Sequence, residues 1–405
     1  MQKVLAILLS GLLSIGSLGS FGFIYSNDLF FINHGASYSS DDLYRTAVNL
    51  TARYPEILTL EIIGRSIDMN PIYVLILTAD IKETMEREDL NVYRKHYFVE
   101  AGTHAREIAN PSIVIKQIED FCKDYYDDDH IEEFSLSEIL EGAVIHFVPL
   151  VNPDGYDLVT IGKSSVRTFM GMDALEGVDD TDYVKFKANL AGVDINRNYP
   201  LEYFDAKTGQ WNRDFEKNTD SLYSPVPRGE FYPGPVSGSE PETRAIMRYV
   251  LRYDFRNYLS YHSRGNVIIA STDWFGQDYA ARESELAMIA SNVTGYDILE
   301  SYDENGSGYF SDFAAAQTLK PTVTVETTTA ELPTSQLYFA EAYKRTYLLP
   351  LYFVQEGERQ GYFKYRLYVN GRYERDFPQL DYANYHAVRM GGVITIGEGT
   401  PAFKQ

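Results

Sequence analysis

Apolar residues repeat at helical spacing in two early parts of the chain. Within Ser39–Tyr54 they fall three or four positions apart, Ser39 or Ser40 is a suitable N-cap, and Pro55 ends the pattern. Pro111–Tyr125 has the same spacing. The sequence therefore predicts an amphipathic helix in each place.

Short apolar runs of strand length alternate with these helical segments. They are Leu58–Ile63, Ile72–Leu77, His96–Glu100, Gly142–Leu150 and Tyr258–Tyr261. Gly142–Leu150 is almost continuously apolar, as in sheets covered on both faces, and a turn at Asn152–Gly155 follows it. The alternation predicts an α/β protein whose mixed, largely parallel central sheet carries helices on both faces.

A further helix start is predicted in the second half of the chain. Ser239 is placed to act as N-cap, and Glu242 stands where it would complete a capping box. Pro241 suits the first turn, because N–H groups there have no acceptor within the helix and the N–H that proline lacks is therefore not needed. This helix is expected to continue through Tyr253.

The composition changes near residue 356, where a polar stretch precedes a Tyr-rich tail. Phe363–Tyr368 and Gly391–Ile396 read as strands, and Asn370-Gly371 reads as a turn. We therefore expect a main domain over residues 25–355 and a small β-rich extension over residues 356–405.

The first 24 residues have the features of an export signal. Lys3 supplies a positive charge, and small residues follow the apolar run Val4–Leu18. That run is shorter than the roughly 20 residues of a membrane span. We expect residues 1–24 to be removed, an uncleaved anchor being the alternative. The mature protein would then be secreted or held in the cell envelope without a stable membrane anchor.

Charge and cysteine content limit the classes of partner to expect and the disulfides that the chain can form. The formal net charge is −22, whereas nucleic acids and anionic membrane surfaces attract Lys and Arg, so we expect neither as a partner. The single Cys122 cannot form an internal disulfide, and its apolar surroundings predict a small buried residue.

Three side chains have the chemistry of a catalytic metal site. His104 and Glu107 stand three residues apart, and His262 follows the distant strand Tyr258–Tyr261. A catalytic zinc ion takes three protein ligands and leaves one position for water. Taken alone, a His-x-x-Glu pair or a single His at a strand end is more often structural or incidental than a metal ligand.

A second string, Gly192–Asn198, supplies groups that would support such a site. Asp194 is the candidate for the carboxylate that orients His104 through its second ring nitrogen. Arg197 offers a bidentate fork for a substrate carboxylate, and Asn196 adds an amide donor. A turn-forming role for Asp194 and a surface ion pair for Arg197 are the alternatives.

The chain resembles the zinc carboxypeptidase family, the carboxypeptidase A-like metallopeptidases, over roughly residues 36–352. The strings that carry the resemblance occur in the family's order and are His104–Glu107, Asn152–Tyr156, Gly192–Tyr199, Ser239–Glu242, Ser260–Ser263 and Thr324–Glu326. The resemblance implies that residues 25–355 are a catalytic domain. It implies one zinc ion on His104, Glu107 and His262, Asn196 and Arg197 on the terminal carboxylate, and Glu326 as general base.

The resemblance also implies roles whose residues are harder to place. Arg167, by its spacing after Gly155, is the candidate for the cation that stabilises the oxyanion, although its surroundings depart from the animal pancreatic pattern. Arg106 is a candidate for the outer subsites. The mobile pocket tyrosine is Tyr309 or Tyr302.

Two substrate classes fit this set of residues. The strings around Asn152 and Asp194 look more like the bacterial branch of the family, which includes γ-D-glutamyl-diamino-acid peptidases that trim cell-wall stem peptides. General removal of protein C-terminal residues is the alternative, and Ser311 favours neither an apolar nor a basic terminal residue. A binding protein that lost catalysis would lack Glu326 or a ligand, and none is missing.

Overall fold

The computed structural model describes residues 38–87, 92–127, 134–205, 210–213, 223–270, 275–299, 308–329, 331, 333 and 336–401. The export signal expected at residues 1–24 lies outside them, as does Tyr302. No helix in the described ranges is long and apolar enough to cross a membrane.

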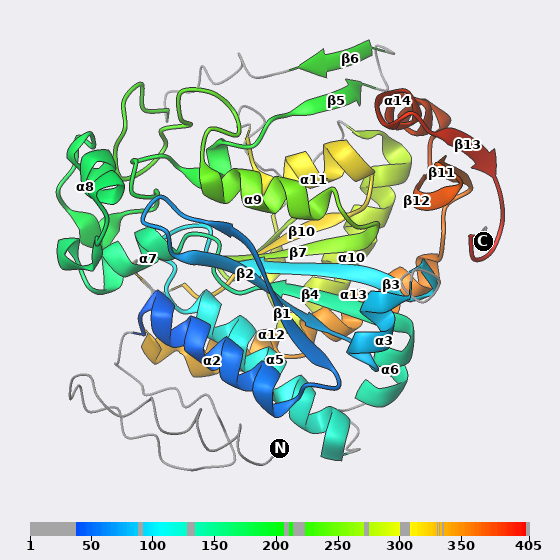
Figure 1. Cartoon of the computed structure of the whole chain (residues 1–405), viewed down its shortest axis with the longest axis horizontal. Helices are drawn as coiled ribbons and strands as arrows, with labels where there is room; N and C mark the ends of the chain where they lie inside the picture. The colour runs from blue at the N-terminus through cyan, green and yellow to red at the C-terminus, as the bar shows by residue number, and fades with distance from the viewer. Residues whose placement is uncertain are drawn as a thin grey trace, which may run out of the picture.

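The described part of the chain is organised around an eight-stranded sheet of order β1-β2-β4-β3-β7-β10-β8-β9 (Figure 1). Its strands are β1 (Leu58–Arg65), β2 (Pro71–Leu77), β3 (Lys95–Ala101), β4 (Ala143–Val148), β7 (Phe255–His262), β8 (Val267–Ala270), β9 (Asp297–Ile298) and β10 (Thr322–Glu326). Strands β4, β3, β7 and β10 are parallel neighbours, whereas β1–β2, β2–β4 and β10–β8 are antiparallel pairs. The predicted mixed, largely parallel sheet is confirmed.

Helices cover both faces of this sheet (Figure 1). On one face lie α2 (Ser40–Arg53), α5 (Asn110–Asp127), α10 (Gln277–Thr294) and α13 (Leu349–Gln360), with α12 (Phe339–Thr346) packed on α5. On the other face lie α9 (Pro241–Val250) and α11 (Phe310–Thr318). Shorter elements complete the connections: α3 (Ile81–Glu86), α6 (Leu136–Gly142), α7 (Pro153–Thr160), α8 (Phe169–Glu176) and the hairpin of β5 (Glu202–Asp205) and β6 (Gln210–Arg213).

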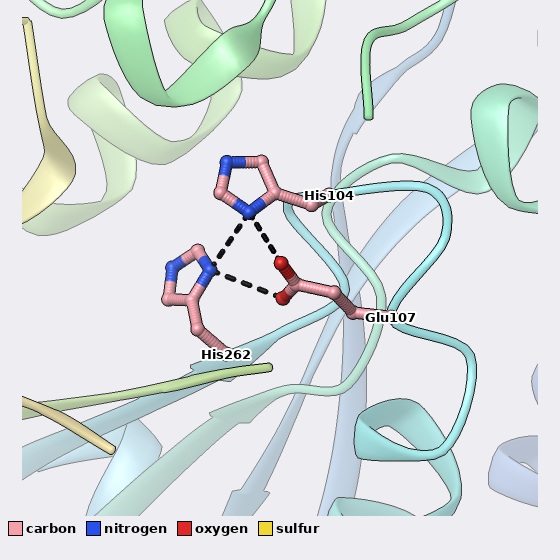
Figure 2. A group of neighbouring side chains, drawn as sticks. All are labelled: His104, Glu107 and His262. Carbon is pink, nitrogen blue, oxygen red and sulfur yellow. Dashed lines mark hydrogen bonds and ion pairs between the residues drawn. The ribbon is translucent and has the colours of Figure 1, made fainter. Parts of the chain in front are cut away.

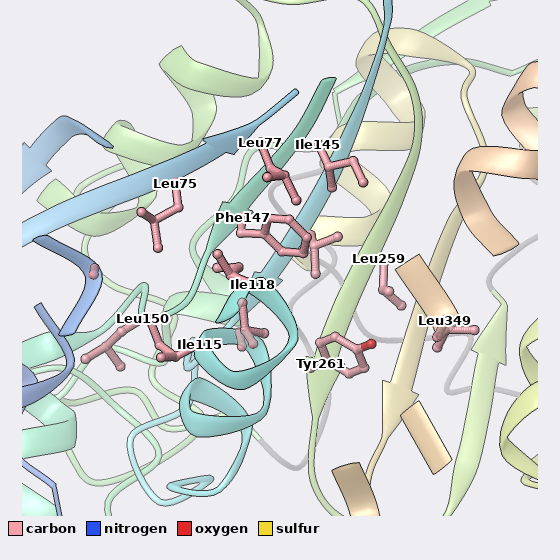
Figure 3. Packing of buried hydrophobic residues seen from close by; sticks show 14 of the residues in the cluster. Leu75, Leu77, Ile115, Ile118, Ile145, Phe147, Leu150, Leu259, Tyr261 and Leu349 are labelled. Atoms are coloured by element: carbon pink, nitrogen blue, oxygen red, sulfur yellow. The ribbon is translucent and has the colours of Figure 1, made fainter. Parts of the chain in front are cut away.

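Alternate residues of a central strand point to opposite faces of the sheet and pack in different hydrophobic cores. Leu75 and Leu77 of β2 belong to the core beneath α2, α5 and α13, whereas Val74 and Ile76 pack under α9 and α11. Figure 3 shows the first of these cores, where Phe147 of β4 faces α5. Every residue of β4 is buried, His146 included, as its almost continuously apolar sequence predicts.

The early helices agree with the sequence, but three local predictions are wrong, one of them that α9 continues through Tyr253, since it ends at Val250. Ser39 caps α2 in a full capping box with Asp42. By contrast, Glu240 is the N-cap of α9 without a side-chain cap, because the Ser239 hydroxyl bonds Glu240 and Asn198 instead. The predicted turn at Asn152–Gly155 opens α7, with the Asn152 side chain accepting the Gly155 N–H at 3.0 Å.

The C-terminal part contains the expected strands and one unexpected helix. Strands β11 (Tyr365–Val369), β12 (Arg372–Phe377) and β13 (Val393–Ile396) form a sheet of order β12-β11-β13, and α14 (Leu380–Met390) packs on it. Asn370-Gly371 makes the hairpin turn, both residues having positive φ. The start of the extension at residue 356 remains a prediction.

Candidate active site

His104, Glu107 and His262 converge at the carboxyl end of the parallel strands. His104 and Glu107 lie on the loop that follows β3, and His262 is the last residue of β7. His104 Nδ1 lies 2.7 Å from a Glu107 oxygen and 3.0 Å from His262 Nδ1 (Figure 2). The second Glu107 oxygen lies 3.2 Å from His262 Nδ1. The three side chains are buried and offer one ligand atom each toward a common point.

This donor set fits a zinc ion. Tetrahedral zinc with Zn–N bonds of about 2.0–2.1 Å separates its ligand atoms by about 3.3 Å, close to the spacing observed here. Burial lowers the pKa of both imidazoles, to about 4 for His262. Both rings are therefore neutral at pH 7, as metal binding requires.

Each histidine has a carboxylate behind it. His104 Nε2 lies 3.4 Å from Asp194, and His262 Nε2 lies 3.9 Å from Glu100 on β3. Glu100 is held in turn by the hydroxyls of Thr103 and Ser260. Such partners set the ring tautomer and orientation of metal-binding histidines. Sequence reasoning proposed Asp194 but missed Glu100, which stands within a predicted strand and carries no local motif.

Glu326 stands beside the metal ligands because β10 and β7 pair in parallel register. The pairing sets Glu326 directly opposite His262. Its Oε2 atom is enclosed and has no hydrogen-bond partner among the described residues. Burial, reinforced by the nearby Glu107 carboxylate, raises the pKa of Glu326 well above its usual range. A divalent ion at the ligands would offset the charge of Glu107 and favour ionised Glu326.

Asn196, Arg197 and Tyr309 line the same cavity, which has a volume of about 230 Å³. The Asn196 side-chain oxygen accepts the Phe310 N–H at 2.8 Å, and the Arg197 guanidinium lies 4.2 Å from the Tyr309 ring centre. The residue before Tyr309 is Gly308, which allows the chain to pass close to the Arg197 backbone. Its φ is +84°, and a Cβ there would lie 2.3 Å from the Arg197 carbonyl oxygen.

Lys187 is a cavity residue that sequence reasoning missed. Its ammonium is buried 3.1 Å from Asp194 and also lines the cavity. Burial lowers the pKa of Lys187, while Asp194 opposes that shift. Burial alone would raise the pKa of Asp194, but Lys187 and Arg197 outweigh it and hold it well below its usual range. No local signal singles out Lys187 in the sequence, where the polar residues Lys185 and Asn189 stand close to it on either side.

The structure does not bring Arg167 to the cavity. Its side chain is 60% exposed, lies 3.7 Å from Asp68 and bonds Asn70. Arg167 was predicted from its spacing after Gly155. The sequence does not reveal that the Asp68 carboxylate accepts hydrogen bonds from the backbone N–H groups of Arg167 and Thr168. Arg106 does line the cavity, with Glu230 as its ion-pair partner at 2.9 Å.

Curated relatives include animal and bacterial peptidases. The chain is 26% identical over 237 residues to the carboxypeptidase N catalytic chain of Mus musculus, a match covering 57% of this chain and 43% of that protein. It is 25% identical over 234 residues to γ-D-glutamyl-L-diamino acid endopeptidase 1 of Lysinibacillus sphaericus, covering 58% of this chain and 54% of the relative. The chain thus matches about half the length of these relatives.

Solved structures share the fold at low identity. Thrombin-activatable fibrinolysis inhibitor matches with a TM-score of 0.58 and 19% identity over 79% of this chain and 75% of that one. Carboxypeptidase A from Helicoverpa armigera matches with a TM-score of 0.55 and 15% identity over 80% and 73%. The zinc carboxypeptidase family model matches residues 43–345, which include every ligand described above. The chain therefore belongs to the zinc carboxypeptidase family, and zinc is the cofactor that its ligand set fits.

Proposed function

We propose that the protein is a zinc-dependent exopeptidase that cleaves bacterial cell-wall stem peptides at the γ-D-glutamyl–diaminopimelate bond. The observation that carries the proposal is one cavity lined by metal ligands, a carboxylate suited to proton transfer and a grip for a terminal carboxylate. Those groups are His104, Glu107, His262, Glu326, Asn196 and Arg197.

Proton transfer is the task of Glu326. Bound zinc supplies Lewis-acid chemistry, polarising the scissile carbonyl and acidifying water. Glu326, ionised, takes a proton from the attacking water while the new C–O bond forms. It then delivers that proton to the leaving amine as the C–N bond breaks. Its enclosed Oε2 atom has no competing partner among the described residues.

Two cations bind the negative charges of the substrate, one at its terminal carboxylate and one at the carbonyl oxygen under attack. Arg197, with Asn196, binds the carboxylate of the departing residue through charge-assisted hydrogen bonds. Lys187 stabilises the negative charge that develops on the carbonyl oxygen, a role that sequence reasoning gave to Arg167. The basis for this choice is position, since Lys187 lines the cavity and Arg167 does not.

The choice of substrate rests on the bacterial relative and on the polarity of the cavity. The relative from Lysinibacillus sphaericus is a γ-D-glutamyl-L-diamino acid endopeptidase. Ser311 and Thr324 line the cavity here, and polar walls suit a diamino acid with charged groups. The alternative is a general metallocarboxypeptidase on protein C-termini, favoured by the match to carboxypeptidase N. Export, either by secretion or to the cell envelope, is inferred from residues 1–24 and belongs to the same proposal.

A paired assay tests the function. Zinc-loaded protein is given L-Ala-γ-D-Glu-meso-diaminopimelate beside hippuryl-type amino-acid substrates, with and without a chelator. We expect diaminopimelate release from the tripeptide, abolished by the chelator and restored by zinc. Faster release from the hippuryl substrates would favour the protein-directed alternative. Turnover of neither would contradict both and favour a non-catalytic binding protein.

A further inference from the structure

The cavity holds more cationic side chains than the proposed reaction uses. Those that line it are Arg106, Lys187, Arg197 and Arg264. The carboxylates that line it are Glu107 and Glu326, of which the first is a metal ligand. In a chain whose formal net charge is −22, this is a local excess of positive charge. A substrate with more than one carboxylate would match it.

Arg106 and Lys187 each have a close anionic partner. Arg106 lies 2.9 Å from Glu230, and Lys187 lies 3.1 Å from the fully buried Asp194. Arg197 is assigned to the carboxylate of the departing residue. One cavity cation, Arg264, therefore has no role in the reaction so far.

Arg264 is held more loosely than the other cations. It follows the metal ligand His262 by two residues, on the connection between β7 and β8, and its side chain is 47% exposed. Its ion-pair partner Glu331 lies 3.3 Å away and is 90% exposed. Exposed pairs of this kind contribute little, so a substrate carboxylate can displace Glu331 at small cost.

We infer that Arg264 binds the α-carboxylate of a γ-linked glutamyl residue whose carbonyl is attacked. The inference rests on the proposed function. A γ-glutamyl linkage leaves a free carboxylate on the residue before the scissile bond, whereas an ordinary α-linked residue has none on its backbone. Such a substrate carries carboxylates on both sides of that bond, and Arg197 binds only one of them. Among the four cations that line the cavity, Arg264 is the exposed one, and it stands two residues after the metal ligand His262 in the chain.

The test compares two tripeptides that differ in one group. The first is L-Ala-γ-D-Glu-meso-diaminopimelate, and the second has isoglutamine in place of γ-D-glutamate, so its α-carboxylate is a neutral amide. We expect the zinc-loaded wild-type protein to favour the carboxylate form about tenfold or more in kcat/KM, as a charge-assisted contact would give. In Arg264→Gln the two substrates should become nearly equal, with zinc content unchanged.

Glu331→Gln separates recognition from a structural role. If the Arg264–Glu331 pair only stabilises the loop, both substitutions should act in the same direction. If Arg264 recognises the substrate, removing its competitor should raise the carboxylate preference about twofold, opposite to Arg264→Gln. Arg45→Gln, which removes an exposed cation of α2 paired with Asp41, is the matched control and should leave the preference unchanged.

The outcomes distinguish this inference from the function on which it rests. Equal turnover of both tripeptides by the wild-type protein, or an unchanged preference in Arg264→Gln, overturns the role of Arg264 and leaves the stem-peptide function standing. Turnover of neither tripeptide by zinc-loaded protein overturns the function and the inference together. A collapsed preference in Arg264→Gln with intact zinc binding supports both.

Discussion

At the scale of single residues, burial and one or two neighbours determine what each reactive group can do. Asp194 remains ionised although it is buried, because Lys187 and Arg197 stabilise its charge. Burial and the nearby Glu107 raise the pKa of Glu326, and a divalent ion at the ligands would oppose that shift and favour the ionised form. In the proposed reaction Asp194 stays charged and Glu326 exchanges a proton, and the two carboxylates have environments that shift their pKa values in opposite directions.

The first prediction concerns Glu326. Glu326→Gln keeps the size of the side chain but removes the proton acceptor, so kcat should fall by about 10²–10⁴-fold. Zinc content, measured by elemental analysis, should stay at one ion per chain because the ligands are untouched. Unchanged turnover would remove Glu326 from the reaction, and loss of zinc would show that Glu326 serves the metal site.

The second prediction separates two candidates for the oxyanion cation. Lys187→Met should lower kcat about 10²–10³-fold, since one donor to the developing charge is lost, and Lys187→Arg should recover part of it. Arg167→Met removes an exposed side chain outside the cavity and should change kcat less than twofold. A larger loss in Arg167→Met than in Lys187→Met, measured on zinc-loaded proteins, would reverse the assignment.

At the scale of elements, parallel strand pairing assembles the site. Strands β3, β7 and β10 are neighbours, and residues of the candidate site lie at or just after the carboxyl end of each. The register of β10 against β7 brings Glu326 beside His262 although 63 residues separate them in sequence. Ligand sites in open α/β sheets occupy this edge for the same topological reason.

The third prediction concerns α9 and its buried Glu242. Burial raises the pKa of Glu242 to about 8, and one of its oxygens has no hydrogen-bond partner among the described residues. Because the folded pKa exceeds the unfolded value, this group's contribution to stability is full at low pH and is lost as pH rises toward 8. Glu242→Gln cannot ionise, so its advantage over wild type should be roughly 2–4 kcal/mol greater at pH 8 than at pH 5.

Urea unfolding of both proteins at the two pH values measures this effect. Glu138→Gln, in the first turn of α6, provides a control whose stability should follow wild type at both pH values. An advantage that is the same at pH 5 and pH 8 would show that Glu242 does not titrate over this range.

At the scale of the whole molecule, the three-stranded C-terminal sheet is joined to the elements around the eight-stranded sheet by a hydrophobic cluster and a network of charged side chains. Leu367 and Phe377 pack with Phe275 and Leu319 in one hydrophobic cluster. Asp376 of β12 is fully buried and accepts hydrogen bonds from Arg256 at 2.8 Å and from Lys320. The extension therefore has structural contacts with β7 and with the residues before β10.

The fourth prediction tests that network. Arg256 and Lys320 outweigh burial and lower the pKa of Asp376 to about 2. Asp376→Asn leaves two buried cations undercompensated and should destabilise the protein by about 3–5 kcal/mol at pH 7. Because the folded pKa is depressed, the deficit should persist above pH 4 and shrink as pH falls toward 2. Asp381→Asn on α14 is exposed and should change stability little.

Some of this protein was accessible from local sequence alone. Helix α2 with its Ser39 cap, the buried strand β4 and the hairpin turn at Asn370-Gly371 depend on neighbouring residues, whose spacing is visible in the chain. The capping box at Ser239 failed because a distant residue, Asn198, engages the Ser239 hydroxyl. A local pattern states which bonds a side chain can make, and the fold selects among them.

The sequence by itself determined the class of fold and the residue types of the metal site, because hydrophobic period and motif order are local properties. Only the tertiary structure decided which cations reach the cavity. Arg167 and Lys187 are both basic residues upstream of Asp194, but Arg167 is held at the surface by Asp68 and Lys187 is buried against Asp194. That difference arises from contacts between segments far apart in sequence, which determine where a charge lies.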